Sequence, residues 1–338
     1  SDDKISWYEN DGSANFTEHI ISTAILSART VYATDVDGDG HIDVLSATYD
    51  FSVRRSVWFK NDGNQNFSEQ VIDSSFYYHT DIVGTDFDGD GDTDIVASTN
   101  QDRILLYVND GNEVFSRNVI STVADGAQGV HVADVDGDND LDILTPLFDD
   151  DEIAWYEHDG SLGFTTRMIT FVTNQVRAVY AIDVDGDGDL DVLSASGADR
   201  KIAWHENDGS GRFTSHAITT TETSATDVFA IDVDGDGDID VLSAASSGGK
   251  ISWYENDGSQ SFTQRVISTN LNSASSVFAA DVDGDGDIDV LSASSSDDRI
   301  AWYENDGNQG FTQHIVTTTA DVALSVFAAD VDSDGDMD

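Results

Sequence analysis

The sequence predicts an all-β fold made of seven copies of one module, and three observations lead to this prediction. An acidic nonapeptide, DVDGDGDID at residues 281–289, recurs seven times with small changes. Its first aspartate falls at Asp35, Asp86, Asp134, Asp183, Asp232, Asp281 and Asp330, at spacings of 51, 48, 49, 49, 49 and 49 residues. The 338 residues include one proline and 28 glycines among many Val, Ile, Thr and aromatic residues, which is typical of strands joined by tight turns. No segment shows a convincing helical period.

Each module is expected to hold four antiparallel strands, here called A to D. In the sixth module they are SVFAAD (276–281), DVLSAS (289–294), RIAWYEN (299–305) and FTQHIVT (311–317). Strands A and B flank the acidic nonapeptide. Strands C and D flank an Asn-Asp-Gly sequence, whose residues tolerate the positive φ of a tight hairpin turn.

Four short strands at a period near 49 residues are typical of one propeller blade. Because a closed ring leaves no sheet edge exposed, seven modules predict a seven-bladed β-propeller. Strand A is expected nearest the axis, where space is narrowest, and the residue two before each acidic loop is small in six modules. These residues are Ala33, Gly84, Ala181, Ala230, Ala279 and Ala328, with Val132 as the exception.

Residues 1–338 are predicted to form a single propeller domain. The expected blades are 29–73, 74–123, 124–172, 173–222, 223–271, 272–320, and 321–338 together with 1–28. The seventh blade is therefore split between the two termini. The equivalent of its strand B, VLSAS in other modules, is found at neither end. We therefore expect either that the chain is part of a longer protein or that this strand comes from outside it.

The charge of the chain restricts its partners. A formal net charge of -51, from 66 acidic and 15 basic residues, excludes nucleic acid or an anionic membrane unless something cancels it. The sequence has no apolar run of membrane-spanning length, so direct membrane insertion is not expected. With no cysteine in the chain, disulfides and thiolate metal sites are excluded.

The acidic loops have the chemistry of a calcium site. Carboxylates at positions 1, 3, 5 and 9 can converge on one centre, the glycine at position 6 allows the sharp turn, and position 7 can offer its backbone carbonyl. Five or more hard oxygen donors in a flexible loop suit Ca²⁺ better than Mg²⁺. An EF-hand is excluded, because position 12 is Ser, Thr or Ala in place of the required Glu, and strands flank the loop. The alternative is a set of acidic surface turns without metal.

Up to seven calcium ions are predicted. The carboxylate ligands are Asp35, Asp37, Asp39 and Asp43; Asp86, Asp88, Asp90 and Asp94; Asp134, Asp136, Asp138 and Asp142; Asp183, Asp185, Asp187 and Asp191; Asp232, Asp234, Asp236 and Asp240; Asp281, Asp283, Asp285 and Asp289; and Asp330, Asp332, Asp334 and Asp338. The backbone ligands are His41, Asp92, Asp140, Asp189, Asp238, Asp287 and Asp336. Two loops depart from the pattern, with Asn139 at position 6 and Ser333 at position 4. Asparagine tolerates the left-handed conformation, so the third loop is expected at most to bind more weakly.

DVDGDGDID with its flanking strands, seven times at this period, resembles the FG-GAP (VCBS) repeat family over essentially the whole chain. The resemblance implies a seven-bladed propeller like the integrin α-subunit head. It also implies Ca²⁺ in the A–B loops on one face and ligand contacts on the opposite face. Such proteins are typically extracellular or on the cell surface, in adhesion, carbohydrate-binding or accessory roles. The near-identity of modules four to six resembles secreted bacterial members.

A ligand face is predicted where the repeats differ most from one another. The B–C and D–A loops of modules one to four carry aromatic and arginine residues that later modules lack: Tyr49, Phe51, Arg54, Arg55, Phe76, Tyr77, Tyr78, Phe148 and Phe171. Clustered exposed aromatics indicate a protein or glycan ligand. The alternatives are unselected divergence or packing against a neighbouring domain of the same protein. The tryptophans of strand C are interpreted as inter-blade core, with sugar-stacking platforms as the alternative.

Two functions remain open. The first is a calcium-binding, non-catalytic extracellular interaction or adhesion propeller. The second is a lectin-like domain or an accessory domain of a secreted polysaccharide-acting enzyme. The chain has no cysteine, no nucleophile-elbow motif and no histidine cluster with zinc spacing, so it is not expected to be an enzyme; a hidden glycosidase or lyase is the alternative.

Overall fold

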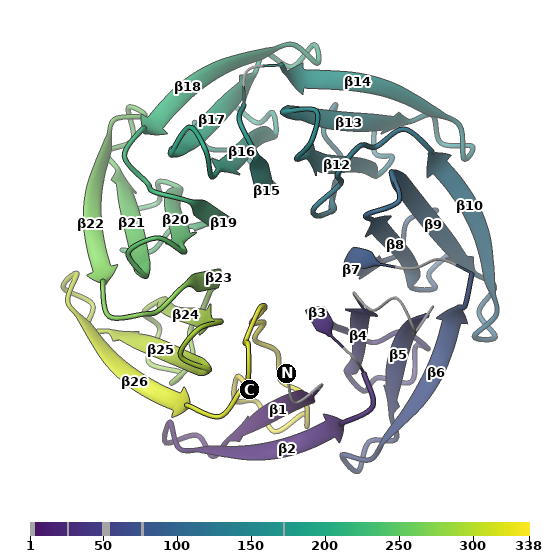
Figure 1. The fold of residues 1–338 in the computed structure, drawn as a ribbon, viewed down its shortest axis with the longest axis horizontal. Coiled ribbons are helices and arrows are strands. Elements are labelled where there is room, and N and C mark those ends of the chain that lie inside the picture. The colour runs from purple at the N-terminus through teal and green to yellow at the C-terminus, as the bar shows by residue number, and fades with distance from the viewer. Residues whose placement is uncertain (1–3, 26, 49–54, 76–77, 172) are drawn as a thin grey trace.

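The computed structural model describes residues 4–25, 27–48, 55–75, 78–171 and 173–338. These residues form 26 strands and no helix, and consequently no helix long and apolar enough to cross a membrane. The strands make six four-stranded antiparallel sheets and one two-stranded sheet, arranged as blades around a central axis (Figure 1). The predictions of an all-β class and of four-stranded antiparallel propeller blades are confirmed.

Each of the six complete blades runs outward from strand A to strand D in chain order. Blade 1 contains β3 (Ala28–Thr34), β4 (Asp43–Thr48), β5 (Ser56–Asn61) and β6 (Phe67–Asp73); blade 2 contains β7 (His79–Thr85), β8 (Asp94–Thr99), β9 (Arg103–Asn109) and β10 (Phe115–Ser121); blade 3 contains β11 (His131–Ala133), β12 (Asp142–Leu147), β13 (Glu152–His158) and β14 (Phe164–Thr170). Blade 4 contains β15 (Val176–Ile182), β16 (Asp191–Ser196), β17 (Lys201–Asn207) and β18 (Phe213–Thr219); blade 5 contains β19 (Ala225–Ile231), β20 (Asp240–Ala245), β21 (Lys250–Asn256) and β22 (Phe262–Ser268); blade 6 contains β23 (Ala274–Ala280), β24 (Asp289–Ser294), β25 (Arg299–Asn305) and β26 (Phe311–Thr317).

The hydrophobic core lies between neighbouring blades. One cluster joins Leu193 and Trp204 of blade 4 to Val241 and Tyr254 of blade 5. All six tryptophans are buried, with exposed fractions between 1 and 6 %. A sugar-stacking platform must be open to solvent, so the interpretation of the tryptophans as inter-blade core is confirmed.

Strand A of each complete blade lies nearest the axis (Figure 1), and side chains of neighbouring A strands pack closely there. A Cβ atom on Gly84 would come within 2.7 Å of Thr34 Cγ2 and 2.9 Å of Leu45 Cδ1, so a glycine fits this point between blades 1 and 2. Aromatic rings of the A strands, and of the equivalent segment of the seventh blade, also contact one another around the axis, at centroid distances of 4.7 to 5.1 Å. These rings are Tyr32, His131, Tyr180, Phe229, Phe278 and Phe327.

The seventh blade lacks the strand A that the sequence predicts for it. It is divided between the termini, but only β1 (Ile5–Asn10) and β2 (Phe16–Ser22) pair in it. Residues 321–338 run beside β1 without forming a strand (Figure 1). No described strand lies between this segment and β1 to pair with it, and a cavity of about 310 Å³ lined by Ile5, Trp7 and Val326 occupies that place. The side chain of Asp338 still joins the ends, accepting hydrogen bonds from Asn10 N at 2.8 Å and Val331 N at 3.0 Å.

Candidate metal centre

The acidic nonapeptides form the A–B loops, and every blade runs in the same sense, so the loops share one face of the ring. In blade 5 the position-1 carboxylate of Asp232 organises the loop. Its Oδ1 accepts the backbone N–H of Gly235 at 2.8 Å, and its Oδ2 accepts that of Gly237 at 2.9 Å. Gly237, at position 6, has a φ of 96°, in the left-handed region that favours glycine. The backbone thus wraps around the first carboxylate.

The two loops that depart from the pattern keep this conformation. Asn139 takes position 6 of the third loop with a φ of 74°, and its N–H reaches Asp134 Oδ2 at 2.9 Å. Ser333 takes position 4 of the seventh loop with a φ of 66°. Asparagine is among the residues that adopt this region most readily, so the third loop folds like the others.

Carboxylates converge within the loops as the sequence predicts. One oxygen from each of three aspartates lies within 4.8 Å of the other two. Such groups include Asp35, Asp37 and Asp39; Asp86, Asp88 and Asp90; Asp134, Asp136 and Asp138; Asp232, Asp234 and Asp236; and Asp183, Asp185 and Asp191. Most of these groups use positions 1, 3 and 5, and the group in blade 4 uses positions 1, 3 and 9.

The position-3 carboxylates have the environment of a cation ligand. Asp136 Oδ1 and Asp234 Oδ1 are buried and have no hydrogen-bond partner. Burial, and after it the adjacent carboxylate of Asp138, raises the pKa of Asp136 above its ordinary value. A buried carboxylate oxygen without a donor is unfavourable unless a cation contacts it. The donor set therefore fits a hard divalent cation.

The position-9 aspartates of blades 1 to 6 are fully buried and join each loop to strand C, whereas Asp338 of the seventh loop is half-buried. Asp240 accepts the N–H of Val233, at position 2, at 3.1 Å through Oδ2 and that of Asn256 at 2.8 Å through Oδ1. Burial raises the pKa of Asp240 to about 7 in spite of these two bonds. A role for position 9 in closing the metal shell remains a prediction, as does a role for the backbone carbonyl at position 7.

The side chain at position 7 packs on the C–D turn of its own blade. A Cβ on Gly258 of the Asn-Asp-Gly turn would lie 2.5 Å from Asp238 Oδ2. The glycine of this turn is therefore required for close approach to the acidic loop, as well as for its positive φ.

The asparagine that ends strand C has a role that the repeat pattern did not predict. Asn305 Nδ2 donates to the carbonyl of Ile288 in its own loop at 3.0 Å and to that of Val233 in the preceding loop at 3.1 Å. The same bond to the preceding loop is made by Asn10, Asn61, Asn109, Asn207 and Asn256. In blade 3 the position holds His158, whose ring lies 5.1 Å from that of Phe87. The recurrence of this asparagine in six modules was the sequence signal for the contact between blades, but the Asn-Asp-Gly turn was a sufficient explanation for it.

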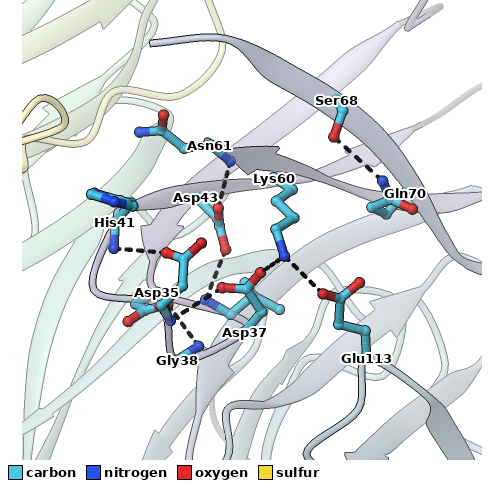
Figure 2. A network of polar contacts seen from close by, with 12 residues as sticks. Asp35, Asp37, Gly38, His41, Asp43, Lys60, Asn61, Ser68, Gln70 and Glu113 are labelled. Atoms are coloured by element: carbon cyan, nitrogen blue, oxygen red, sulfur yellow. Dashed lines mark hydrogen bonds and ion pairs between the residues drawn. The ribbon is translucent and has the colours of Figure 1, made fainter. Parts of the chain in front are cut away.

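The strand-C residue before this asparagine faces position 3 of the acidic loop. In blade 1 this residue is Lys60, and its ammonium group forms ion pairs with Asp37 and, at 2.8 Å, with Glu113 (Figure 2). In five blades the residue is a glutamate, and in blade 2 it is Val108. The sequence analysis assigned no role to this position.

The predicted ligand face is described only in part. Tyr49, Phe51, Arg54, Phe76 and Tyr77 lie outside the described residues. Of the others, Arg55 is paired with Glu69 at 2.6 Å, and the carbonyl of Tyr78 accepts a hydrogen bond from Asn100 N at 2.9 Å. Phe171 is 68 % exposed, and the Phe148 ring lies 5.1 Å from the guanidinium of Arg177. The contacts of these four residues do not place them in one cluster.

Arg177 also lines an axial cavity of about 500 Å³. The cavity is bounded by the first residues of the A strands, so it opens on the face opposite the acidic loops. Asp81 and Asp227 line it, and each bonds to the next blade, with Asp81 Oδ2 accepting Val130 N at 3.0 Å. Asp81 and Asp227 occupy a strand-A position that is not acidic in the other modules. This departure from the repeat was the sequence signal for the cavity.

The sequence model of the family described as FG-GAP-like repeat matches seven segments of the chain. They are residues 1–46, 35–97, 86–145, 147–194, 183–243, 232–292 and 281–338. A search of curated protein sequences gave no match.

Solved structures similar to this chain share its fold. A functionally unknown protein from Desulfotomaculum acetoxidans has a TM-score of 0.65 at 13 % identity, covering 100 % of this chain and 95 % of that one. A protein from Lactobacillus plantarum has a TM-score of 0.65 at 12 % identity, covering 95 % and 97 % of the two chains. A chain from the complex of BBS1N with ARL6DN has a TM-score of 0.60 at 14 % identity, covering 86 % and 84 %. At these identities the likeness is one of fold alone.

Proposed function

The chain belongs to the FG-GAP-like repeat family, and on that premise we propose that it is a calcium-binding, non-catalytic interaction or adhesion propeller of the extracellular space. The observation that carries the proposal is the buried, unpartnered oxygen of Asp136 and of Asp234, each within a group of three converging carboxylates. Seven such loops in a chain of net charge -51 repel one another unless cations bind.

Calcium fits these loops better than magnesium. Positions 1, 3 and 5 supply carboxylates, and positions 7 and 9 offer further oxygens if the loop tightens around an ion. Ca²⁺ takes six to eight oxygen ligands in flexible geometry, whereas Mg²⁺ requires a near-ideal octahedron and keeps several waters. Extracellular calcium is millimolar, so weak sites would be filled there.

Bound calcium would stabilise the ring as well as the single loop. Each loop connects strand A to strand B, and in every blade but the third the strand-C asparagine ties its own loop to the loop of the preceding blade, as Asn305 does by bonding to Ile288 and Val233. An ion that binds the folded loop and not the unfolded chain adds its binding free energy to the stability of the fold. Removal of calcium is therefore expected to loosen contacts between blades.

The test is a titration of chelator-treated protein with Ca²⁺ and then with Mg²⁺, following ion stoichiometry and melting temperature. We expect several ions per chain and a rise in melting temperature specific to Ca²⁺. Asp234→Asn should remove one ion, whereas Asp257→Asn, in an exposed C–D turn, should remove none. Absence of Ca²⁺ binding at millimolar concentration would refute the proposal.

The partner is proposed to bind the face opposite the loops. It would be a protein ligand, a glycan or a neighbouring domain of the same protein. A lectin-like or accessory role is the second candidate, favoured by the axial cavity of about 500 Å³ with its serine, threonine and aspartate lining and by the exposed ring of Phe171. A glycan array probed in calcium with the wild type, Phe171→Ala and Asp227→Asn separates the two. Binding lost in a variant that keeps its melting temperature supports the lectin, and an array without signal favours a protein partner.

A further inference from the structure

The acidic loop of blade 1 already contacts a cation that the protein itself supplies. The ammonium group of Lys60 is paired with the position-3 carboxylate of Asp37 (Figure 2). The side chain of Asp37 is only 3 % exposed and that of Lys60 29 %, so water screens this contact less than it screens a fully exposed ion pair. No other described loop has a lysine or arginine paired with its position-3 aspartate among the ion pairs of the structure.

The other blades place a different charge at this point. Five of them have a glutamate where blade 1 has Lys60: Glu9, Glu157, Glu206, Glu255 and Glu304. Burial is the main reason that the pKa of Asp136 is raised, but the negative charge of Glu157 contributes, which shows that the two side chains lie near each other. Blade 2 has the neutral Val108.

The glutamates are themselves paired with basic side chains of strand D. Glu255 is paired with Arg265 at 2.5 Å, and Glu304 with His314 at 2.7 Å. In blade 1 the strand-D position holds the neutral Gln70, whose amide donates to Ser68 at 3.4 Å (Figure 2). Five of the other blades thus have a strand-C glutamate paired with a basic strand-D residue beside the loop, whereas blade 1 has the ammonium group of Lys60 alone. Position 7 changes in the same direction, from aspartate to His41.

We propose that Lys60 is a built-in competitor for calcium, which makes the loop of blade 1 the weakest of the sites and the first to empty as calcium falls. This inference rests on the proposed function and deepens it. An ammonium that stays within about 5 Å of a divalent ion weakens its binding by at least about tenfold, even at the dielectric constant of bulk water. Lys60 therefore has to leave Asp37 for the site to fill tightly.

The structure provides a second position for the lysine. Glu113, in the C–D turn of blade 2, accepts the same ammonium group at 2.8 Å. When calcium occupies the loop, Lys60 can keep this contact and release Asp37. Occupancy of the first loop is thereby linked to the contact between blades 1 and 2, and Glu113 acts as the residue that positions Lys60.

The chain itself supplies the variants for the test. Lys60→Glu introduces the residue of five other blades, and Lys60→Val introduces that of blade 2. Native mass spectrometry counts the bound ions at a free Ca²⁺ concentration that fills the tight sites only, and calorimetric titration gives the affinities. We expect Lys60→Glu to gain one tight ion over the wild type, with at least about tenfold tighter binding at that site. Lys60→Val should fall between the two.

Site-resolved controls use the position-3 aspartates. Asp37→Asn should leave the number of tight ions unchanged, whereas Asp234→Asn should lower it by one. Circular dichroism and melting without calcium verify that each variant folds. The inference is overturned if Asp37→Asn removes a tight ion, or if folded Lys60→Glu binds no more ions than the wild type. If no variant binds calcium at all, the proposed function fails together with this inference, and that result is distinct from either of the first two.

Discussion

Replacing Asn305 by alanine tests whether the strand-C asparagines hold adjacent blades together. The Asn305 side chain is 3 % exposed and makes three hydrogen bonds. It donates to Val233 O at 3.1 Å and to Ile288 O at 3.0 Å, and it accepts Gly307 N at 3.2 Å. Removing the side chain leaves two largely buried carbonyls without this donor. At about 1 kcal/mol for each bond lost, and more where a group stays unsatisfied, the cost is about 2–4 kcal/mol.

The assay is urea denaturation followed by tryptophan fluorescence, in saturating calcium and in chelator. Asn308→Ala is the matched control, because Asn308 lies in the same turn, is exposed and donates to Asp306 O at 2.9 Å. We expect the control to change the free energy of unfolding by less than about 0.5 kcal/mol. An Asn305→Ala variant as stable as this control would refute the reasoning, since the two carbonyls would then have other partners. The loss should persist in chelator, because the bonds do not involve the ion.

Two further predictions concern pH and the seventh blade. Burial, and to a smaller extent the charge of Lys201, lowers the pKa of the His205 imidazole to about 4, whereas histidine in an unfolded chain titrates near 6.5. Between pH 4 and pH 6.5 the unfolded chain binds a proton at His205 that the folded chain does not bind. Lowering the pH therefore favours the unfolded chain. The free energy of unfolding keeps its full value above about pH 6.5 and is about 2 kcal/mol lower at pH 5. The unfolding free energy of the wild type measured against that of His205→Gln should shift by this amount between pH 7 and pH 5, and a constant difference would contradict it. Extending the chain after Asp338 with Val-Leu-Ser-Ala-Ser, the strand-B sequence of blades 4 and 6, should fill the cavity beside Ile5 and Trp7 and add at least about 2 kcal/mol, because valine and leucine become buried. An extension with two prolines in the same five residues is the control, and equal melting temperatures for the two extended chains would argue against a strand in this place.

The repeat predicted the blades well because the information for a blade is local. A–B and C–D hairpins form between segments close in the chain, and their turns contain the glycine, asparagine and aspartate residues that such turns require. The convergence of three carboxylates followed from the same local spacing. The tryptophans of strand C were also placed correctly in the core, because an aromatic residue repeated once per module has to fit the same inter-blade space each time.

The seventh blade shows the limit of reasoning from the repeat. Its strand A has the same sequence pattern as the others, yet residues 323–330 form no strand in the structure. A strand needs a hydrogen-bonded neighbour, and among the described residues no strand pairs with this segment on its β1 side. The local sequence of residues 323–330 predicted where this segment runs, but strand formation depends on a pairing partner that the local sequence does not contain.

The sequence by itself determined the kind of blade, the period at which blades repeat and the position of the acidic loops whose carboxylates converge. Tertiary structure alone decided which residues support those loops from other blades. Asn305 reaches a carbonyl 72 positions earlier in the chain, and Lys60 meets Glu113 of the next blade, 53 positions later. Such contacts depend on the angle at which neighbouring blades pack, and this angle is fixed by the closure of the whole ring and not by any single repeat.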